Sequence, residues 1–120
     1  MDSETIKTMI RAYNHEVFDK RNKAAYYDML APNYIGHDLV SGQDHSLADM
    51  IMPDPDPDSI TNVHIEIKDI VVEGDRAAFH WSATGLSEGA PVEVVGCSFY
   101  RFENGKVVED TYFNTLVKRA

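Results

Sequence analysis

Hydrophobic and polar positions alternate along the second half of the chain in a way that predicts four consecutive β-strands. The strand-like runs cover residues 60–73, 76–85, 92–103 and 106–117. Gly74-Asp75 separates the first two runs, and Asn104-Gly105 separates the last two. Both residues of an Asn-Gly pair tolerate a positive φ, as the two-residue type I′ hairpin turn requires. The pattern therefore predicts an antiparallel meander.

The first fifty residues show helical periodicity instead. Apolar side chains recur on one helical face, at Ile6, Met9, Ile10, Tyr13 and Val17. Asp2 or Ser3 can cap this helix. A second helix is expected over 24–30, then a short strand at Tyr34-Ile35, a third helix over 42–52, and a proline-rich loop over 53–58.

Helices followed by a long curved antiparallel sheet predict an α+β fold. We expect the N-terminal helices to pack on the sheet of a half-open cone, whose hollow can hold a small molecule. A chain of 120 residues that is 43% hydrophobic suffices for one domain over 1–120.

Charge and cysteine content narrow the function classes. Eleven Lys and Arg against twenty Asp and Glu give a net charge of −9, which disfavours nucleic acid and anionic membranes as partners. Cys97 stands alone in an apolar strand, so no disulfide framework is expected. The five histidines lack metal-ligand spacing, so no metal is expected, and no motif implies an organic cofactor. The acidic N-terminus is unlike a signal peptide, and a cytoplasmic protein is expected.

Three motifs together resemble a known family. They are Tyr34-Ile35-Gly36-His37-Asp38, the run from Ile70 to Arg76, and the hairpin from Tyr100 to Glu109. In order and spacing the chain resembles the SnoaL-like polyketide cyclases, within the nuclear transport factor 2-like superfamily. The resemblance implies a cone-shaped α+β fold and a homodimer built from the outer faces of two sheets.

The resemblance makes His37 and Asp38 candidate catalytic residues. SnoaL-like proteins typically have a histidine at the position of His37. In the related ketosteroid isomerases the carboxylate that moves the proton lies near the position of Asp38. A carboxylate in an apolar pocket has a raised pKa and accepts protons better. Adjacent strand residues point to opposite faces, so both cannot point inward if the strand continues. The alternative is that either side chain anchors the loop.

Two further strands carry candidate ligand-binding residues. On the second strand Phe79 and Trp81 share one face and His80 lies on the other, so either Trp81 is the floor of the hollow or His80 is an acid or base there. The favoured arrangement places Phe79 and Trp81 inward. Tyr100 can donate a hydrogen bond to a ligand oxygen or serve as a core aromatic, and Arg101 is expected to point outward.

The last strand departs from the family pattern. SnoaL-like cyclases generally carry a catalytic acid there, and the matching positions lie between Thr111 and Thr115, none of which is acidic. Thr111 or Asn114 can orient a substrate there but cannot act as a general base near neutral pH. Asp110 is close by, but alternation places it with Val108 and Tyr112.

Two functions from different classes follow. The first is a cofactor-free proton-transfer enzyme of the isomerase or aldol-cyclase type, acting on a mostly apolar carbonyl compound. In it Asp38 or His37 takes the proton, and Tyr100, Asn114 or His80 steadies the enolate oxygen. The alternative is a non-catalytic small-molecule-binding or dimeric accessory module, which the missing acid favours.

Overall fold

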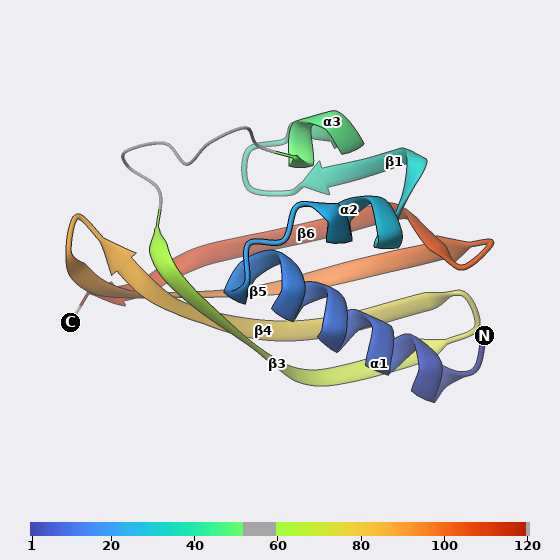
Figure 1. Ribbon diagram of the computed structural model, residues 1–120, viewed down its shortest axis with the longest axis horizontal. Coiled ribbons are helices and arrows are strands. Elements are labelled where there is room, and N and C mark those ends of the chain that lie inside the picture. Colours follow the sequence, from blue (N-terminus) through green and yellow to red (C-terminus); the bar gives the residue numbers. More distant parts are fainter. Residues whose placement is uncertain (52–59, 120) are drawn as a thin grey trace.

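The computed structural model describes residues 1–51 and 60–119, arranged as Figure 1 shows. The elements are α1 (Ser3–Asn14), η1 (His15–Asp19), α2 (Ala24–Met29), β1 (Leu30–Asp38), β2 (Asp44–Ser46), α3 (Leu47–Met50), β3 (Thr61–Glu73), β4 (Arg76–Ser87), β5 (Ala90–Glu103) and β6 (Lys106–Arg119). The predicted loop over 53–58 lies outside the described residues. Within them, no helix has the length and apolar character needed to cross a membrane.

Strands β3 to β6 form the predicted meander within one six-stranded sheet of order β2-β1-β6-β5-β4-β3. Each of the four is antiparallel to the next along the chain. The turn at Asn104-Gly105 has two residues, since Glu103 pairs with Lys106, and both turn residues have positive φ, at 51° and 80°. This confirms the predicted hairpin turn.

Strand β1 is longer than the predicted Tyr34-Ile35. It runs from Leu30 to Asp38, parallel to β6 on one side and antiparallel to β2 on the other. The predicted strand of two residues is therefore too short, because Gly36, His37 and Asp38 continue it. Both neighbouring strands supply main-chain partners there, and this pairing outweighs the local freedom of glycine.

The helical half differs from the prediction in two places. The first helix is α-helical only to Asn14 and continues as the π-helical turn η1; Asp2 caps its start by accepting a 2.7 Å hydrogen bond from the Thr5 amide. The prediction of a third helix over residues 42–52 is wrong for most of that range. Gly42 has a positive φ, β2 follows it, and only α3 is helical, with Ser46 as its cap.

The core lies between the helices and one face of the sheet, here called the inner face. Side chains of α1, η1 and α2 pack there against β3 to β6; the central ones are Ile6, Ile10, Tyr13, Val17, Ile65, Ile67, Phe79, Tyr100, Phe102 and Val107. Figure 1 shows α1 and α2 lying across the same side of the curled, unclosed sheet. The opposite, outer face leaves large apolar side chains exposed, among them Val71, Phe99 and Phe113.

Candidate functional site

The centre of the inner face holds a buried acid, Asp110, on β6. It is 8% exposed and pairs in register with Tyr100 of β5 on one side and Gly36 of β1 on the other. Among the described residues it is the one acidic side chain in the buried class. The Tyr34 hydroxyl lies 3.3 Å from its Oδ2, whereas its Oδ1 is buried with no hydrogen-bond partner in the part of the chain described.

Burial decides the protonation of this group. Removal from water disfavours the carboxylate and raises the Asp110 pKa to about 7, although the hydrogen bond from Tyr34 opposes the rise. A buried oxygen without a partner costs free energy, most of all when it carries charge. Asp110 therefore exchanges a proton near neutral pH, where a general acid or base works best.

Tyrosines surround the acid. Tyr13 of α1, Tyr34 of β1 and Tyr100 of β5 are all buried, and burial is the main cause of the raised pKa of each phenol. Tyr100 meets Phe79 edge to face, with ring centroids 5.0 Å apart. Neutral phenols beside a carboxyl group offer hydrogen-bond donors but no compensating positive charge.

The inner face becomes more accessible along β6 beyond Asp110. Tyr112 is half-buried, and its pKa is raised to about 12 by burial and by the nearby Asp38 and Asp110 carboxyls. Asn114, two residues further, is exposed and lies opposite Gly96 of β5. Alternation places Asp110, Tyr112 and Asn114 on the same face, from the core towards solvent.

Trp81 of β4 lies on this accessible part of the inner face. It is half-buried, packs against the core and donates a hydrogen bond from its indole nitrogen to the Ser98 hydroxyl at 3.4 Å. A Cβ at Gly96 would lie 2.5 and 2.7 Å from two atoms of the indole ring, so the ring rests directly on the β5 backbone. Phe79 and Trp81 thus point inward, as the favoured strand parity predicts.

His37 lies on the outer face rather than beside the acid. Its Nδ1 is 2.7 Å from Asp44 Oδ1, and its Nε2 is 2.8 Å from Glu109 Oε2. These two hydrogen bonds raise the pKa of the imidazole, while His37 and Arg101 together lower the pKa of Glu109. His37 is therefore part of a surface ion-pair network.

Asp38 anchors the loop after β1. Its Oδ1 accepts hydrogen bonds from the amides of Val40, at 2.9 Å, and Ser41, at 3.2 Å. Chiefly because of the Ser41 amide, the pKa of Asp38 lies below its ordinary value, opposite to the shift expected for a carboxylate in an apolar pocket. The geometry matches the loop-anchoring alternative.

The remaining predicted ligand-binding residues divide between the two faces. Tyr100 and Asn114 lie on the inner face with Trp81, whereas His80 and Thr111 lie on the outer face. His80 is exposed, with its Nε2 3.1 Å from Asp69 Oδ2. The structure brings Trp81, Tyr100 and Asn114 to one face and separates them from His37, His80 and Thr111.

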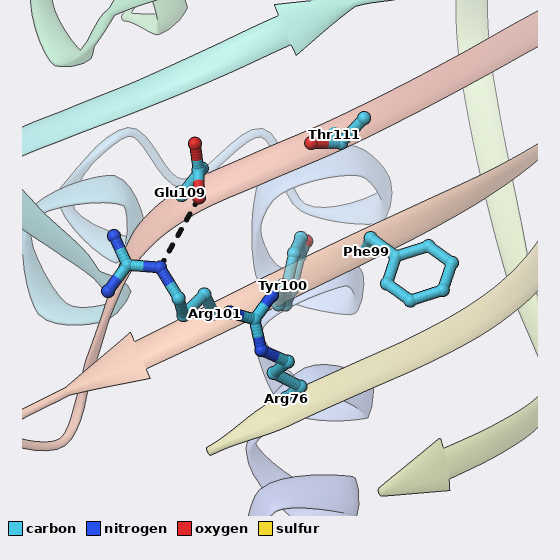
Figure 2. A pocket seen from close by; sticks show the side chains of 6 residues that line it. All are labelled: Arg76, Phe99, Tyr100, Arg101, Glu109 and Thr111. Atoms are coloured by element: carbon cyan, nitrogen blue, oxygen red, sulfur yellow. Dashed lines mark hydrogen bonds and ion pairs between the residues drawn. The ribbon is translucent and has the colours of Figure 1, made fainter. Parts of the chain in front are cut away.

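A shallow depression of about 190 Å³ lies on the outer face and is lined by Arg76, Phe99, Tyr100, Arg101, Glu109 and Thr111. Figure 2 shows Arg101 reaching across to Glu109, and their ion pair measures 3.3 Å. The exposed Arg76 and the half-buried Arg101 beside the exposed Phe99 are typical of a protein contact surface.

Alternation along β6 groups Asp110 with Tyr112, but it does not show which face of the strand the helices cover. The positions expected to match the family's acid, Thr111 to Thr115, begin one residue after the buried acid that the structure shows. The apolar Phe99 and Phe113 lie on the outer face and the polar Asp110 on the inner face, so the polarity of the side chains alone misleads.

Helices packed on the inner face of a curled, mostly antiparallel sheet give the α+β cone fold of the nuclear transport factor 2-like class. A family model described as the SnoaL-like domain matches residues 10–110. The chain belongs to the SnoaL-like family.

Solved structures agree with this fold. A protein named as a polyketide cyclase of Acidithiobacillus ferrooxidans is 18% identical, with a TM-score of 0.77 over 95% of this chain and 91% of that one. AclR of Streptomyces galilaeus, named as a hydroxylase, is 18% identical, with a TM-score of 0.76 over 97% and 77%. A nuclear transport factor 2-like protein of Burkholderia xenovorans is 20% identical, with a TM-score of 0.71 over 98% and 88%. No curated protein sequence matches the chain.

Proposed function

We propose that this protein binds a small, mostly apolar carbonyl compound on its inner face and moves a proton next to the carbonyl without an organic cofactor. The observation that carries the proposal is Asp110, a buried carboxyl whose pKa of about 7 lets it both accept and return a proton at neutral pH. Neighbours named as polyketide cyclases make carbonyl chemistry a reasonable expectation.

The proton transfer proceeds in two steps, removal of a proton from carbon and its return. The Asp110 carboxylate takes the proton from the carbon next to the carbonyl; the C–H bond breaks, an O–H bond forms, and the electron pair moves to the carbonyl oxygen as an enolate. Return of the proton to carbon restores the carboxylate. Asn114 lies four residues further along β6, about 13 Å away at the usual rise per strand residue, so it can donate an amide hydrogen to a polar group of the ligand remote from the reacting carbon.

Apolar side chains would hold the rest of the ligand. The half-buried Trp81 offers a large aromatic surface, and Tyr112 stands between Asn114 and the acid along β6. Since Oδ1 of Asp110 is buried in this structure, ligand binding requires the side chains that cover it to move aside. In the free protein the same side chains exclude water from this oxygen.

Hydrogen–deuterium exchange tests the proposal with a defined probe. 1-Tetralone, an apolar cyclic ketone, is incubated with the protein in D₂O, and loss of its α-proton signal is followed by NMR. The wild type should accelerate exchange, and Asp110→Asn should lose roughly 10²–10⁴-fold of the acceleration. Asp38→Asn is the matched control and should retain it. Full activity of Asp110→Asn, or loss only in Asp38→Asn, would contradict the assignment.

The second candidate is a non-catalytic binding or dimeric accessory module. It is favoured by the covered oxygen of Asp110 and by the apolar outer face, where Val71, Phe99 and Phe113 are 68%, 58% and 48% exposed. Contiguous apolar side chains of this kind are typical of an interface, and two-fold dimers are the commonest assembly. Light scattering should give a dimer for the wild type and a monomer for Phe99→Glu. A wild-type monomer at micromolar concentration contradicts the dimer.

A further inference from the structure

The Tyr34 side chain lies along its own strand, over the backbone of Gly36, and reaches the buried acid. Its ring is 1% exposed, and its hydroxyl lies 3.3 Å from Asp110 Oδ2. The side chains of Tyr34 and Gly36 belong to the same face of β1, and Gly36 pairs in register with Asp110. The phenol therefore spans the position that a side chain at residue 36 would occupy.

The space at Gly36 is needed for this contact. A Cβ built there would lie 2.6 Å from the Tyr34 hydroxyl oxygen, 3.2 Å from the carbon that carries it, and 3.3 Å from the Tyr112 ring. Contacts below 3.0 Å force one of the groups to move. Gly36 has no positive φ, so backbone conformation does not require glycine here. The requirement is space for the phenol.

The hydrogen bond makes the two oxygens of Asp110 different. Oδ2 is occupied by Tyr34, whereas Oδ1 has no partner among the described residues. A carboxyl group with one oxygen held has a restricted side-chain torsion, so its other oxygen keeps a defined position. Preorganisation of this kind lowers the cost of aligning a reacting group.

We propose that Tyr34 and Gly36 are positioning residues that hold Asp110 by Oδ2 and leave Oδ1 as the oxygen available to a ligand. The role of that oxygen rests on the proposed proton transfer, whereas the positioning itself concerns the free protein. Tyr34 donates to the carboxylate and thereby favours its charged form. Gly36 acts only through Tyr34, by leaving its phenol room.

A pH titration of the Asp110 carboxyl carbon tests this positioning directly. It is followed by ¹³C NMR of protein labelled at aspartate. The signal is assigned by its loss in Asp110→Asn. Tyr34→Phe, which keeps the ring and removes one oxygen, should raise the Asp110 pKa by about one unit, a tenfold change in the acid dissociation constant. Gly36→Ala should shift it in the same direction. Tyr26→Phe, which removes the hydroxyl of a half-buried tyrosine packed against the same core, should leave it unchanged.

The double variant Tyr34→Phe/Gly36→Ala separates positioning from a general disturbance of the core. Because Gly36 acts through the Tyr34 hydroxyl, the double variant should titrate like Tyr34→Phe alone. Additive shifts would overturn the role of Gly36, and an unshifted Tyr34→Phe would overturn the whole inference. If tetralone exchange is lost in Asp110→Asn but unchanged in Tyr34→Phe, only the positioning role of Tyr34 is refuted. If the Asp110 pKa shifts as predicted but the wild type does not accelerate tetralone exchange, only the proposed function is refuted.

Discussion

Replacement of Asp110 by Asn should change how the stability of the protein depends on pH. The folded pKa is about 7, whereas the ordinary value is 3.8. A raised carboxyl pKa gives stability that is fully present below the unfolded value and is lost as pH rises through the folded value. The shift of about three units corresponds to roughly 4 kcal/mol, since one unit is about 1.4 kcal/mol.

The asparagine side chain has nearly the same shape and no charge, so it removes this loss. The free energy of unfolding of the variant, minus that of the wild type, should increase by about 4 kcal/mol between pH 4 and pH 8. Taking the difference cancels the contributions of the titrating groups that both proteins share, except for the interaction of His37 with the Asp110 charge. This difference in the free energy of unfolding should grow steadily from about pH 4 to the folded pKa of about 7 rather than only near pH 4.

Urea unfolding at a fixed protein concentration measures this difference, with the fluorescence of Trp81, the one tryptophan of the chain, as the signal. Asp38→Asn is the control. The pKa of Asp38 is lowered, so its contribution is lost only as pH falls through the acid range, with the opposite sign. A difference for Asp110→Asn that stays flat from pH 4 to pH 8 would refute the reasoning.

Three further predictions concern other parts of the molecule. Asp19→Ala removes the 2.9 Å hydrogen bond that Asp19 accepts from the Ile65 amide, and urea unfolding at pH 7 should show that the free energy of unfolding falls by about 1–3 kcal/mol. Because the Asp19 pKa is lowered, this destabilisation should shrink at acid pH. Gly96→Ala forces Trp81 from the β5 backbone and should cost about 1–3 kcal/mol and shift the tryptophan emission; unchanged emission would contradict the packing. His37→Gln should destabilise more at pH 5.5 than at pH 8.5, since a raised histidine pKa stabilises only until pH rises through it; equal urea midpoint shifts would contradict this.

The strands of the meander could be predicted because their signals are local. Asn104-Gly105 specifies a tight turn by its own φ preferences, and alternation of side chains continues on either side of it. Strand β1 could not be delimited in this way. Pro32 and Gly36 resemble strand breakers, and the parallel pairing with β6 joins segments more than seventy residues apart.

The site was predictable only in part, for a similar reason. Alternation shows which residues share a face but not which face is covered by helices. Trp81 and Tyr100 are apolar enough to indicate the inner face, whereas Asp110 is a charged residue type that usually lies outside. Its burial follows from long-range packing against Tyr34 of β1 and from pairing with Tyr100 of β5, which no local pattern contains.

Mapping of amide chemical shifts during titration with 2-naphthol, a phenol that resembles an enol, tests the central claim most directly. Binding at the inner face should move the signals of Trp81, Tyr112 and Asn114, and affinity should change as pH passes 7, where Asp110 titrates. In Asp110→Asn that pH dependence should vanish. Shifts confined to the outer-face residues Phe99 and Thr111, or an affinity that does not vary with pH in the wild type, would contradict the account.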